Sequence, residues 1–481
     1  MYKFAIPLLC SVSLVACDVV GPNYVAPTTD VHSHFVGGGT RQLISASENR
    51  WWTQLGDPLL SEFVERGNMR NLDIQLGLER IRASQAAAGT VGVNGLTSGA
   101  LSASSTQGEV NGVQADNDTV QVNANYVFDL FGGAARSEEQ ARANIQASQA
   151  DVGVVRLAFM SQLINSYIQA RFFQESAAIT QQTIRSRRET LALVQQRRDA
   201  GEATELEVQQ ARANLASSEA SLPTTQANFD SNIFAIATLL DEDAEDIRGL
   251  MYRDKSQPRP RVPSQAGIPA DLIRNRPDIR SAERSLASAT AAIGVTESQL
   301  YPSISLAGSI AGGTTERWSL GPSLNIPLLN RGVLKANLEV AESQARQAEI
   351  AYRQTVLTAV EEVQSAIALC LGWHRQLNSQ ESAERAAASV LRLSRESYRG
   401  GAITLTEVLD AERQLANSRL STADALRNYT ASWVQMHIAT GQGWRAESLL
   451  QPLETEPAEV PVDPFGVKEG QGLAGLFNAN N

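Results

Sequence analysis

Aromatic residues and pairable cysteines are scarce in this chain. Phe, Trp and Tyr make up 6% of its 481 residues, and two of its three cysteines, Cys10 and Cys17, lie in the N-terminal apolar run. Once that segment is removed, Cys370 has no partner, so a disulfide framework is excluded. Ala, Ser and Gln are abundant instead, which is typical of long helices that pack closely through small side chains.

Positive charge is also in short supply. Lys and Arg number 41 against 52 Asp and Glu, a formal net charge of −11. Phosphate recognition needs clustered basic side chains, so we expect no nucleic-acid partner. The chain contains no GxSxG, P-loop or zinc spacing, so we expect neither an enzyme nor a cofactor. His32 and His34 form a His-x-His pair that could hold a metal, but a solvated loop is the simpler interpretation, and we expect no metal site.

The N-terminus has the features of an export signal. Residues 1–16 carry one cation, Lys3, and an apolar core too short to span a bilayer. The core ends in Leu-Val-Ala-Cys, which resembles a bacterial lipobox and predicts a covalent lipid on Cys17; an ordinary signal with a chance cysteine is the alternative. One acyl chain anchors a protein only marginally, so a second membrane element is expected.

The most informative internal feature is a tandem repeat with an offset of 200 residues. Both copies begin with a glycine and then place apolar residues seven apart, the spacing of a coiled-coil seam. The seams are Val208, Leu215, Leu222, Phe229 and Ile236 in the first copy, and Val408, Leu415, Tyr429 and Met436 in the second, where Thr422 fills the polar slot. The chain is therefore predicted to contain one long helical hairpin, built twice.

Each hairpin is preceded by a segment that alternates with period two. TVQVNANYVFDL and WSLGPSLNIPL both place apolar residues at even positions and mainly polar residues at odd ones, the pattern of a strand with two different faces. We predict β-hairpins within 90–131 and 303–328. Helices of about 60 residues follow, reaching roughly 90 Å, and reverse at Gly201 and at Gly400–Gly401.

The predicted organisation follows from these patterns. It comprises a signal peptide (1–16), a lipid-anchored tether (17–56), a first repeat (57–250), a linker (251–270), a second repeat (271–447) and a flexible tail (448–481).

Four strands are too few to close a membrane barrel, which needs about eight. Three chains would supply twelve, and their helices would extend the barrel as a hollow tube. The predicted fold is an α+β membrane protein: a trimeric 12-stranded β-barrel, four strands per chain, continuous with a long periplasmic α-helical coiled-coil barrel. An elongated coiled-coil scaffold without a lumen is the alternative.

Several blocks of sequence resemble a known family. The lipobox, GPNYVAP, WWTQLGDPLL, IPADLIRNRPDIRSAE, QLYPSISLAGSI and YRGGAITLTEVLDAERQL follow one another as in the outer-membrane factor (TolC-like) family, in its lipid-anchored branch that serves RND tripartite efflux systems. The resemblance covers Cys17 to about Trp444. It implies a homotrimeric, passive exit duct in the outer membrane and periplasm, in contact with outer-membrane lipid, a periplasmic adaptor and an inner-membrane RND transporter. A duct for type I protein secretion is the alternative.

The resemblance also implies specific sites at the far end of the helices. Glu407 and Asp410 match the acidic residues that ring the narrowest aperture, and a spacing of three puts both on one helical face; a solvated acidic face is the alternative. Tyr398 and Glu207 match a link that locks the closed tip in some relatives, although Ile403 replaces the arginine of that lock. The turns Arg198 to Gly201 and Tyr398 to Gly401, including Gly400, match adaptor-docking grooves.

The residue after the predicted lipid-bearing Cys17 bears on localisation. Aspartate at this position, here Asp18, is associated with inner-membrane retention in some bacteria, but we expect this protein in the outer membrane.

Overall fold

The structure, a computed structural model, describes residues 19–27, 50–110, 113–252, 256–260, 276–313 and 316–444. Cys17, Asp18, His32, His34, the signal peptide, most of the linker and the tail 448–481 lie outside the described residues. The predictions for them are therefore untested by the structure.

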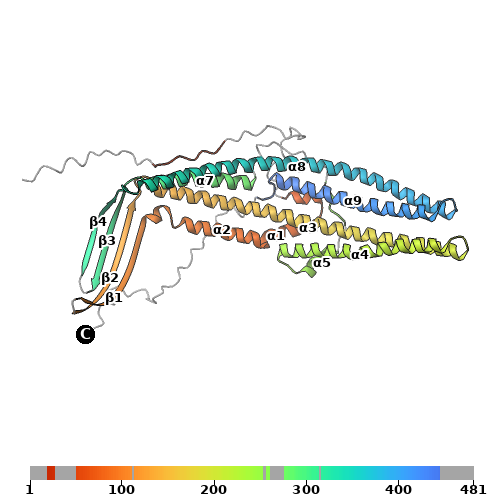
Figure 1. Cartoon of the computed structure of the whole chain (residues 1–481), viewed down its shortest axis with the longest axis horizontal. Coiled ribbons are helices and arrows are strands. Elements are labelled where there is room, and N and C mark those ends of the chain that lie inside the picture. Colours follow the sequence, from red (N-terminus) through yellow and green to blue (C-terminus); the bar gives the residue numbers. More distant parts are fainter. Residues whose placement is uncertain are drawn as a thin grey trace, which may run out of the picture. The chain divides into compact units, whose positions relative to one another are not determined.

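The described elements follow one order twice (Figure 1). The first series is η1 (Trp51–Leu55), α1 (Pro58–Arg70), α2 (Leu72–Ala88), η2 (Gly92–Leu96), β1 (Thr97–Val110), β2 (Val113–Phe128), α3 (Gly133–Asp199), α4 (Glu205–Leu240) and α5 (Ala244–Met251). The second is α7 (Pro277–Ser298), β3 (Ser303–Gly313), β4 (Arg317–Asn325), α8 (Arg331–Arg399) and α9 (Leu405–Ala439). The helices α4 and α9 begin 200 residues apart, as the offset of the repeat predicted.

The four strands form one antiparallel sheet in the order β1-β2-β3-β4. β2 and β3, which come from different repeats, pair in the middle, with Asn123 opposite Ser309. β1 and β4 are the outer strands, and each has a second edge without a strand partner in the described chain. Each half of the molecule therefore contributes one hairpin to a sheet that is open on both sides.

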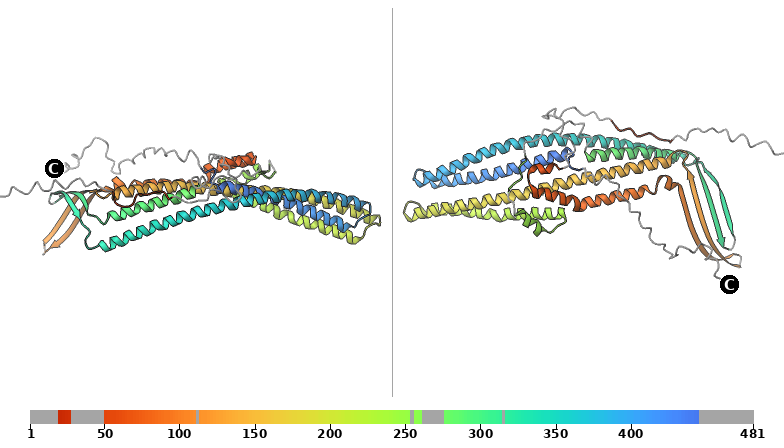
Figure 2. Two further views of the ribbon diagram at one scale, coloured as in Figure 1. Left: turned by 90° about the horizontal axis from the view of Figure 1, so that it is seen from above. Right: turned by 180° about the vertical axis from the view of Figure 1, so that it is seen from behind.

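The long helices pair within each repeat. α3 runs beside α4 and α8 beside α9, with the sheet at one end and the two helix–helix turns at the other (Figures 1 and 2). The predicted seam positions Val208, Phe229, Val408 and Met436 are buried. At about 1.5 Å per residue, the 67 residues of α3 reach about 100 Å. The heptad spacing thus buries one stripe of each helix along most of its length.

Two local features of the first repeat go beyond the predicted organisation. The helical segment before β1 is divided at Asn71, whose Oδ1 accepts hydrogen bonds from the backbone N–H of Asp73 and Ile74. Asn71 thereby caps the start of α2 and separates it from α1. The short helix α5 after α4 was also not predicted.

The main core lies midway along the helices, where residues from both repeats meet. Trp51 stacks on His437 with ring centroids 5.0 Å apart, and Trp433 contacts both rings. The His437 Nδ1 lies 2.6 Å from the Gln442 Oε1, and the Trp51 indole N–H donates to the Gln442 carbonyl. This cluster joins the segment before α1 to the end of α9.

Arg276, the first arginine of the NRPDIRSAE block, connects α7 with α8 and α9. Its guanidinium donates to the Ala439 carbonyl at 2.6 Å and to the carboxylates of Asp278 and Glu362, both at 2.7 Å. One side chain at the start of α7 therefore satisfies a carbonyl at the C-terminal end of α9 and pairs with α8. A cation at a helix C-terminus is favourable because it opposes the negative end of the helix dipole.

Candidate functional site

The two helix–helix turns have nearly the same construction. Gly201 and Gly401 have φ values of 77° and 72°, a left-handed conformation that favours glycine. Thr204 and Thr404 then cap α4 and α9, each in a capping box with a glutamate three residues on. Both glycines are exposed, with no heavy atom close to where a side chain would begin.

The predicted gate residues Glu407 and Asp410 are both exposed and each has a partner in its own helix. The Glu407 Oε2 accepts from the Thr404 backbone N–H at 2.7 Å and from its hydroxyl at 3.0 Å. The Asp410 Oδ1 accepts from Arg413 at 2.7 Å. In one chain, Glu407 thus caps α9 and Asp410 pairs along it; the gate, which requires three copies around an axis, stays a prediction.

The predicted lock residues Tyr398 and Glu207 are not hydrogen-bonded to each other. The Glu207 Oε2 accepts from Thr204, and the buried Tyr398 hydroxyl has no hydrogen-bond partner in the described part of the chain. Burial, and then the nearby Glu207 carboxylate, raise the pKa of Tyr398, so the hydroxyl stays protonated. The Tyr398–Glu207 link also stays a prediction.

Arg197 is the cation that contacts Tyr398. Its guanidinium lies 4.7 Å from the centre of the Tyr398 ring and donates to the Tyr398 carbonyl at 2.7 Å. Ile403, where the resemblance implies an arginine in some relatives, packs instead against the apolar cluster near the turns. Sequence reasoning missed Arg197 because its contact joins residues 201 positions apart.

A buried polar network links the two helical hairpins a few turns from the tip. Glu412 on α9 is 3% exposed, and its Oε1 accepts from Arg395 on α8 at 2.7 Å and from the Thr190 hydroxyl on α3 at 2.6 Å. Arg395 also donates to the carbonyl and hydroxyl of Ser186 on α3. Beside the network is a polar cavity of about 340 Å³. No sequence pattern pointed to this network.

The sheet has one apolar and one polar face. On the apolar face, large side chains are exposed in the single chain: Leu101, Val120, Val122, Tyr126, Phe128, Leu306, Ile310, Trp318, Leu320 and Leu324. The other face consists of the even-numbered residues of β1 and the odd-numbered residues of β2, β3 and β4, and we call it the polar face. An apolar surface of this size exposed on one chain indicates contact with lipid or protein.

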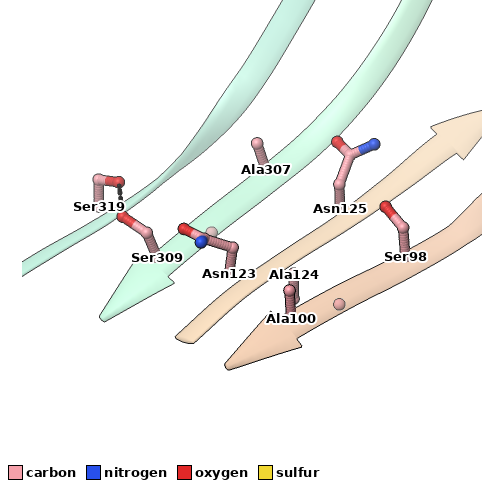
Figure 3. A pocket seen from close by; sticks show the side chains of 10 residues that line it. Ser98, Ala100, Asn123, Ala124, Asn125, Ala307, Ser309 and Ser319 are labelled. Atoms are coloured by element: carbon pink, nitrogen blue, oxygen red, sulfur yellow. Dashed lines mark hydrogen bonds between the residues drawn. The ribbon is translucent and has the colours of Figure 1, made fainter. Parts of the chain in front are cut away.

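Apart from Arg317 at the start of β4, the described side chains of the polar face are neutral and mostly small. A shallow hollow of about 390 Å³ there includes Ser98, Asn123, Asn125 and Ser309, which project from three adjacent strands (Figure 3). The Ser309 and Ser319 hydroxyls are 2.8 Å apart and hydrogen-bond across β3 and β4. Such a surface suits contact with water rather than with lipid.

A segment close to the N-terminus is fastened at the base of the sheet. The Val20 N–H donates to the Phe131 carbonyl, just beyond β2. Arg136 at the start of α3 donates to the carbonyls of Val20 and Gly21 and to the Asn23 side chain. Gly21, with φ 88°, lies so close to Gly294 of α7 that a Cβ would be 2.4 Å from its Cα. Residues 19–23 thereby bridge the two repeats where helices become strands.

Comparison with known proteins shows which family this chain belongs to. The model of the family described as outer membrane efflux protein matches residues 69–241 and 268–442, one match in each repeat. The chain belongs to this family. It is an outer-membrane efflux channel, and the channels of this family are not enzymes.

Individual relatives agree with the family match. Nodulation protein T of Rhizobium leguminosarum bv. viciae is 34% identical over 94% of this chain and 96% of its own length. The pyoverdine export outer membrane protein OpmQ of Pseudomonas putida is 27% identical over 91% of this chain and 97% of its own. The solved outer-membrane channel OprN superposes with a TM-score of 0.79 at 29% identity, covering 88% of this chain and 99% of that one.

Proposed function

We propose that three copies of this efflux channel assemble as one 12-stranded barrel continuous with a tube of helices. The open-edged sheet with one apolar and one polar face is the observation that carries the proposal. Unpaired strand edges are unfavourable in a membrane because their backbone N–H and C=O groups have no partner there, and closure of the sheets of several copies pairs these edges. The apolar face then contacts lipid and the polar face lines a water-filled lumen.

The helices also have a surface suited to further copies. Large apolar side chains of α8 are exposed in the single chain, among them Val333, Val340, Ile350, Leu357 and Leu369. α8 is also long and apolar enough over 18 residues to cross a membrane by composition. Burial against helices of a neighbouring copy accounts for these side chains as well, at about 25 cal/mol per Å² of apolar area removed from water.

We further propose that the channel is the exit duct of a tripartite pump, with a periplasmic adaptor and an inner-membrane RND transporter. The exposed turns at Gly201 and Gly401 are the surfaces for the adaptor, and Glu407 and Asp410 ring the aperture. The names of relatives support export of solutes, since one is a pyoverdine export protein and another is the cation efflux system protein CusC of Escherichia coli.

A lipid on Cys17 completes the proposed membrane attachment. Val19 packs against Gly132, and the Val20 N–H is hydrogen-bonded to the Phe131 carbonyl. The described chain therefore lies at the base of the sheet from two residues after Cys17. An acyl chain there would enter the same membrane as the barrel, and the barrel would supply the second element that one lipid requires.

Two measurements test the proposed function. The purified full-length protein should form water-filled channels in planar bilayers, and deletion of the gene should lower export of small solutes while secretion of proteins continues. A protein that never conducts would contradict the channel, and loss of protein secretion with unchanged solute export would favour a type I secretion duct.

A further inference from the structure

Arg317 is the only charged residue on the polar face among its described side chains. It opens β4, opposite Ala311 on β3, and is exposed. The other described side chains of this face belong to Ser, Thr, Asn, Gln, Ala, Val and Gly residues. A single cationic side chain therefore interrupts an otherwise neutral surface.

The position of Arg317 within the sheet is well defined by the topology. The strands β2 and β4 lead into α3 and α8 at one end of the sheet, and Arg317 lies at the opposite end, beside the turn between β3 and β4 (Figure 1). Of the acidic residues near this end, Glu109 and Asp118 occupy positions of the apolar face, and Glu316 directly precedes Arg317 just outside β4. Within the described strands, no carboxylate therefore shares the polar face with Arg317.

We infer that Arg317 sets the charge preference of the outer mouth, where it favours anionic solutes and repels cations. The inference rests on the proposed trimer, in which the polar face lines the lumen and three Arg317 side chains surround it. Arginine remains protonated at every physiological pH, so this charge is permanent. The rest of the polar face within the described strands is neutral, so Arg317 is the strand position that can give this face a charge preference.

The field of three guanidiniums can act across a lumen of this size. Barrels of about 8 strands are filled by side chains and those of 16 to 18 leave a wide aqueous pore, so 12 strands enclose an intermediate passage. The Debye length is about 10 Å at 0.1 M salt and about 30 Å at 0.01 M. Low-dielectric walls concentrate the field further. The effect should therefore be large at low salt and disappear near 1 M.

Reversal potentials of single channels in a KCl gradient test the inference. For the purified full-length protein in planar bilayers at low ionic strength, Arg317→Gln should raise the permeability ratio of K⁺ to Cl⁻, and Arg317→Glu should raise it further. The matched control is Asp118→Asn, which also removes one charge at the same end of the sheet but from the other face, and which should leave the ratio unchanged. At 1 M salt all four proteins should agree.

The outcomes separate this inference from the proposed function. If Arg317→Gln conducts with the wild-type ratio at low salt, Arg317 does not govern the mouth although the channel exists. An equal change in the ratio for Asp118→Asn would also overturn the inference, because the effect would then be one of general surface charge. If the wild-type protein itself does not conduct, the proposed channel fails and the inference fails with it.

Discussion

Single residues decide how the helical hairpins turn. Gly400 and Gly401 are adjacent, but only Gly401 has a positive φ, 72°, whereas Gly400 has an ordinary helical conformation. A side chain on an L-residue in the left-handed region costs about 1–2 kcal/mol. The two glycines therefore offer a matched pair for testing the geometry of the turn that is proposed to contact the adaptor.

We expect Gly401→Ala to loosen this turn and Gly400→Ala to leave it nearly unchanged. A penalty of about 1–2 kcal/mol raises the population of locally open turns by a factor of about 5–30. Hydrogen exchange of the amides at residues 399–404 measures this opening. Equal exchange in the two variants would show that the left-handed conformation does not matter.

His437 makes stability depend on pH. Its burial between Trp51 and Trp433 lowers its pKa to about 4, with a smaller opposing effect from the hydrogen bond to Gln442. In the unfolded chain the pKa is near 6.5, so the unfolded state takes up the proton first as the pH falls. The stability that depends on neutral His437 is complete above about pH 6.5 and is lost as the pH falls toward 4.

We therefore expect the free energy of unfolding to fall by up to about 1.4 kcal/mol per pH unit from this group between pH 6.5 and 4. His437→Gln cannot titrate and should have a shallower pH dependence, whatever its stability at pH 7. Urea unfolding of the detergent-solubilised protein, followed by Trp fluorescence at several pH values, gives both slopes. Identical slopes would mean that His437 is not the titrating group.

At the scale of elements, the network around Glu412 joins the hairpins of the two repeats. Replacement by Gln removes the charge while keeping an acceptor for Thr190 and Arg395. A hydrogen bond to a charged group contributes about 1.5–3 kcal/mol when buried. Glu412→Gln should lower the free energy of local opening at the α9 amides near residue 412 by an amount in this range, as measured by hydrogen exchange.

Glu219 provides the matched control for Glu412. It accepts from Arg188 at 2.6 Å, but this pair is exposed and lies within the first hairpin, between α3 and α4. Exposed ion pairs contribute about 0–1 kcal/mol, so Glu219→Gln should have little effect. If hydrogen exchange shows the same loss of opening free energy in both variants, the Glu412 network does not stabilise the contact between the hairpins.

The same elements show what could be predicted from the sequence. Alternation with period two located both strand pairs, heptad spacing located the long helices, and the offset of 200 located both glycine turns, because each of these signals is local. The matching Thr204–Glu207 and Thr404–Glu407 pairs are visible in the sequence as well and form capping boxes, while the gate at Glu407 and the lock at Glu207 stay predictions.

Contacts between distant segments could not be predicted. Thr190 and Glu412 are 222 positions apart, and Arg197 and Tyr398 are 201 apart. Neither pair has a spacing that a single sequence reveals, because these contacts depend on how one hairpin packs on the other. The break at Asn71 could not be predicted for a different reason, because apolar residues continue on both sides of it, with Leu60 and Phe63 before it and Ile74 and Ile81 after it.

At the scale of the whole molecule, the account depends on sheet closure between copies. One chain leaves an edge of β1 and an edge of β4 unpaired in its described part and exposes its apolar face. The proposed lumen, gate ring and charged mouth all require that β4 of one copy pair with β1 of the next. This pairing can be tested with introduced cysteines, because the native Cys370 is buried. Burial raises the pKa of its thiol to about 11 and makes it unreactive.

Disulfide cross-linking between the edge strands is the most direct measurement. Cysteines would be placed at Ser102 on β1 and, one at a time, at Ser319, Gly321 or Ser323 on β4, with Ser309 on the inner strand β3 as the control. We predict that at least one edge pair gives a covalent ladder that ends at the trimer, while the Ser102–Ser309 pair gives none. Protein that stays monomeric with every edge pair, or a ladder that ends at another number of copies, would contradict the account.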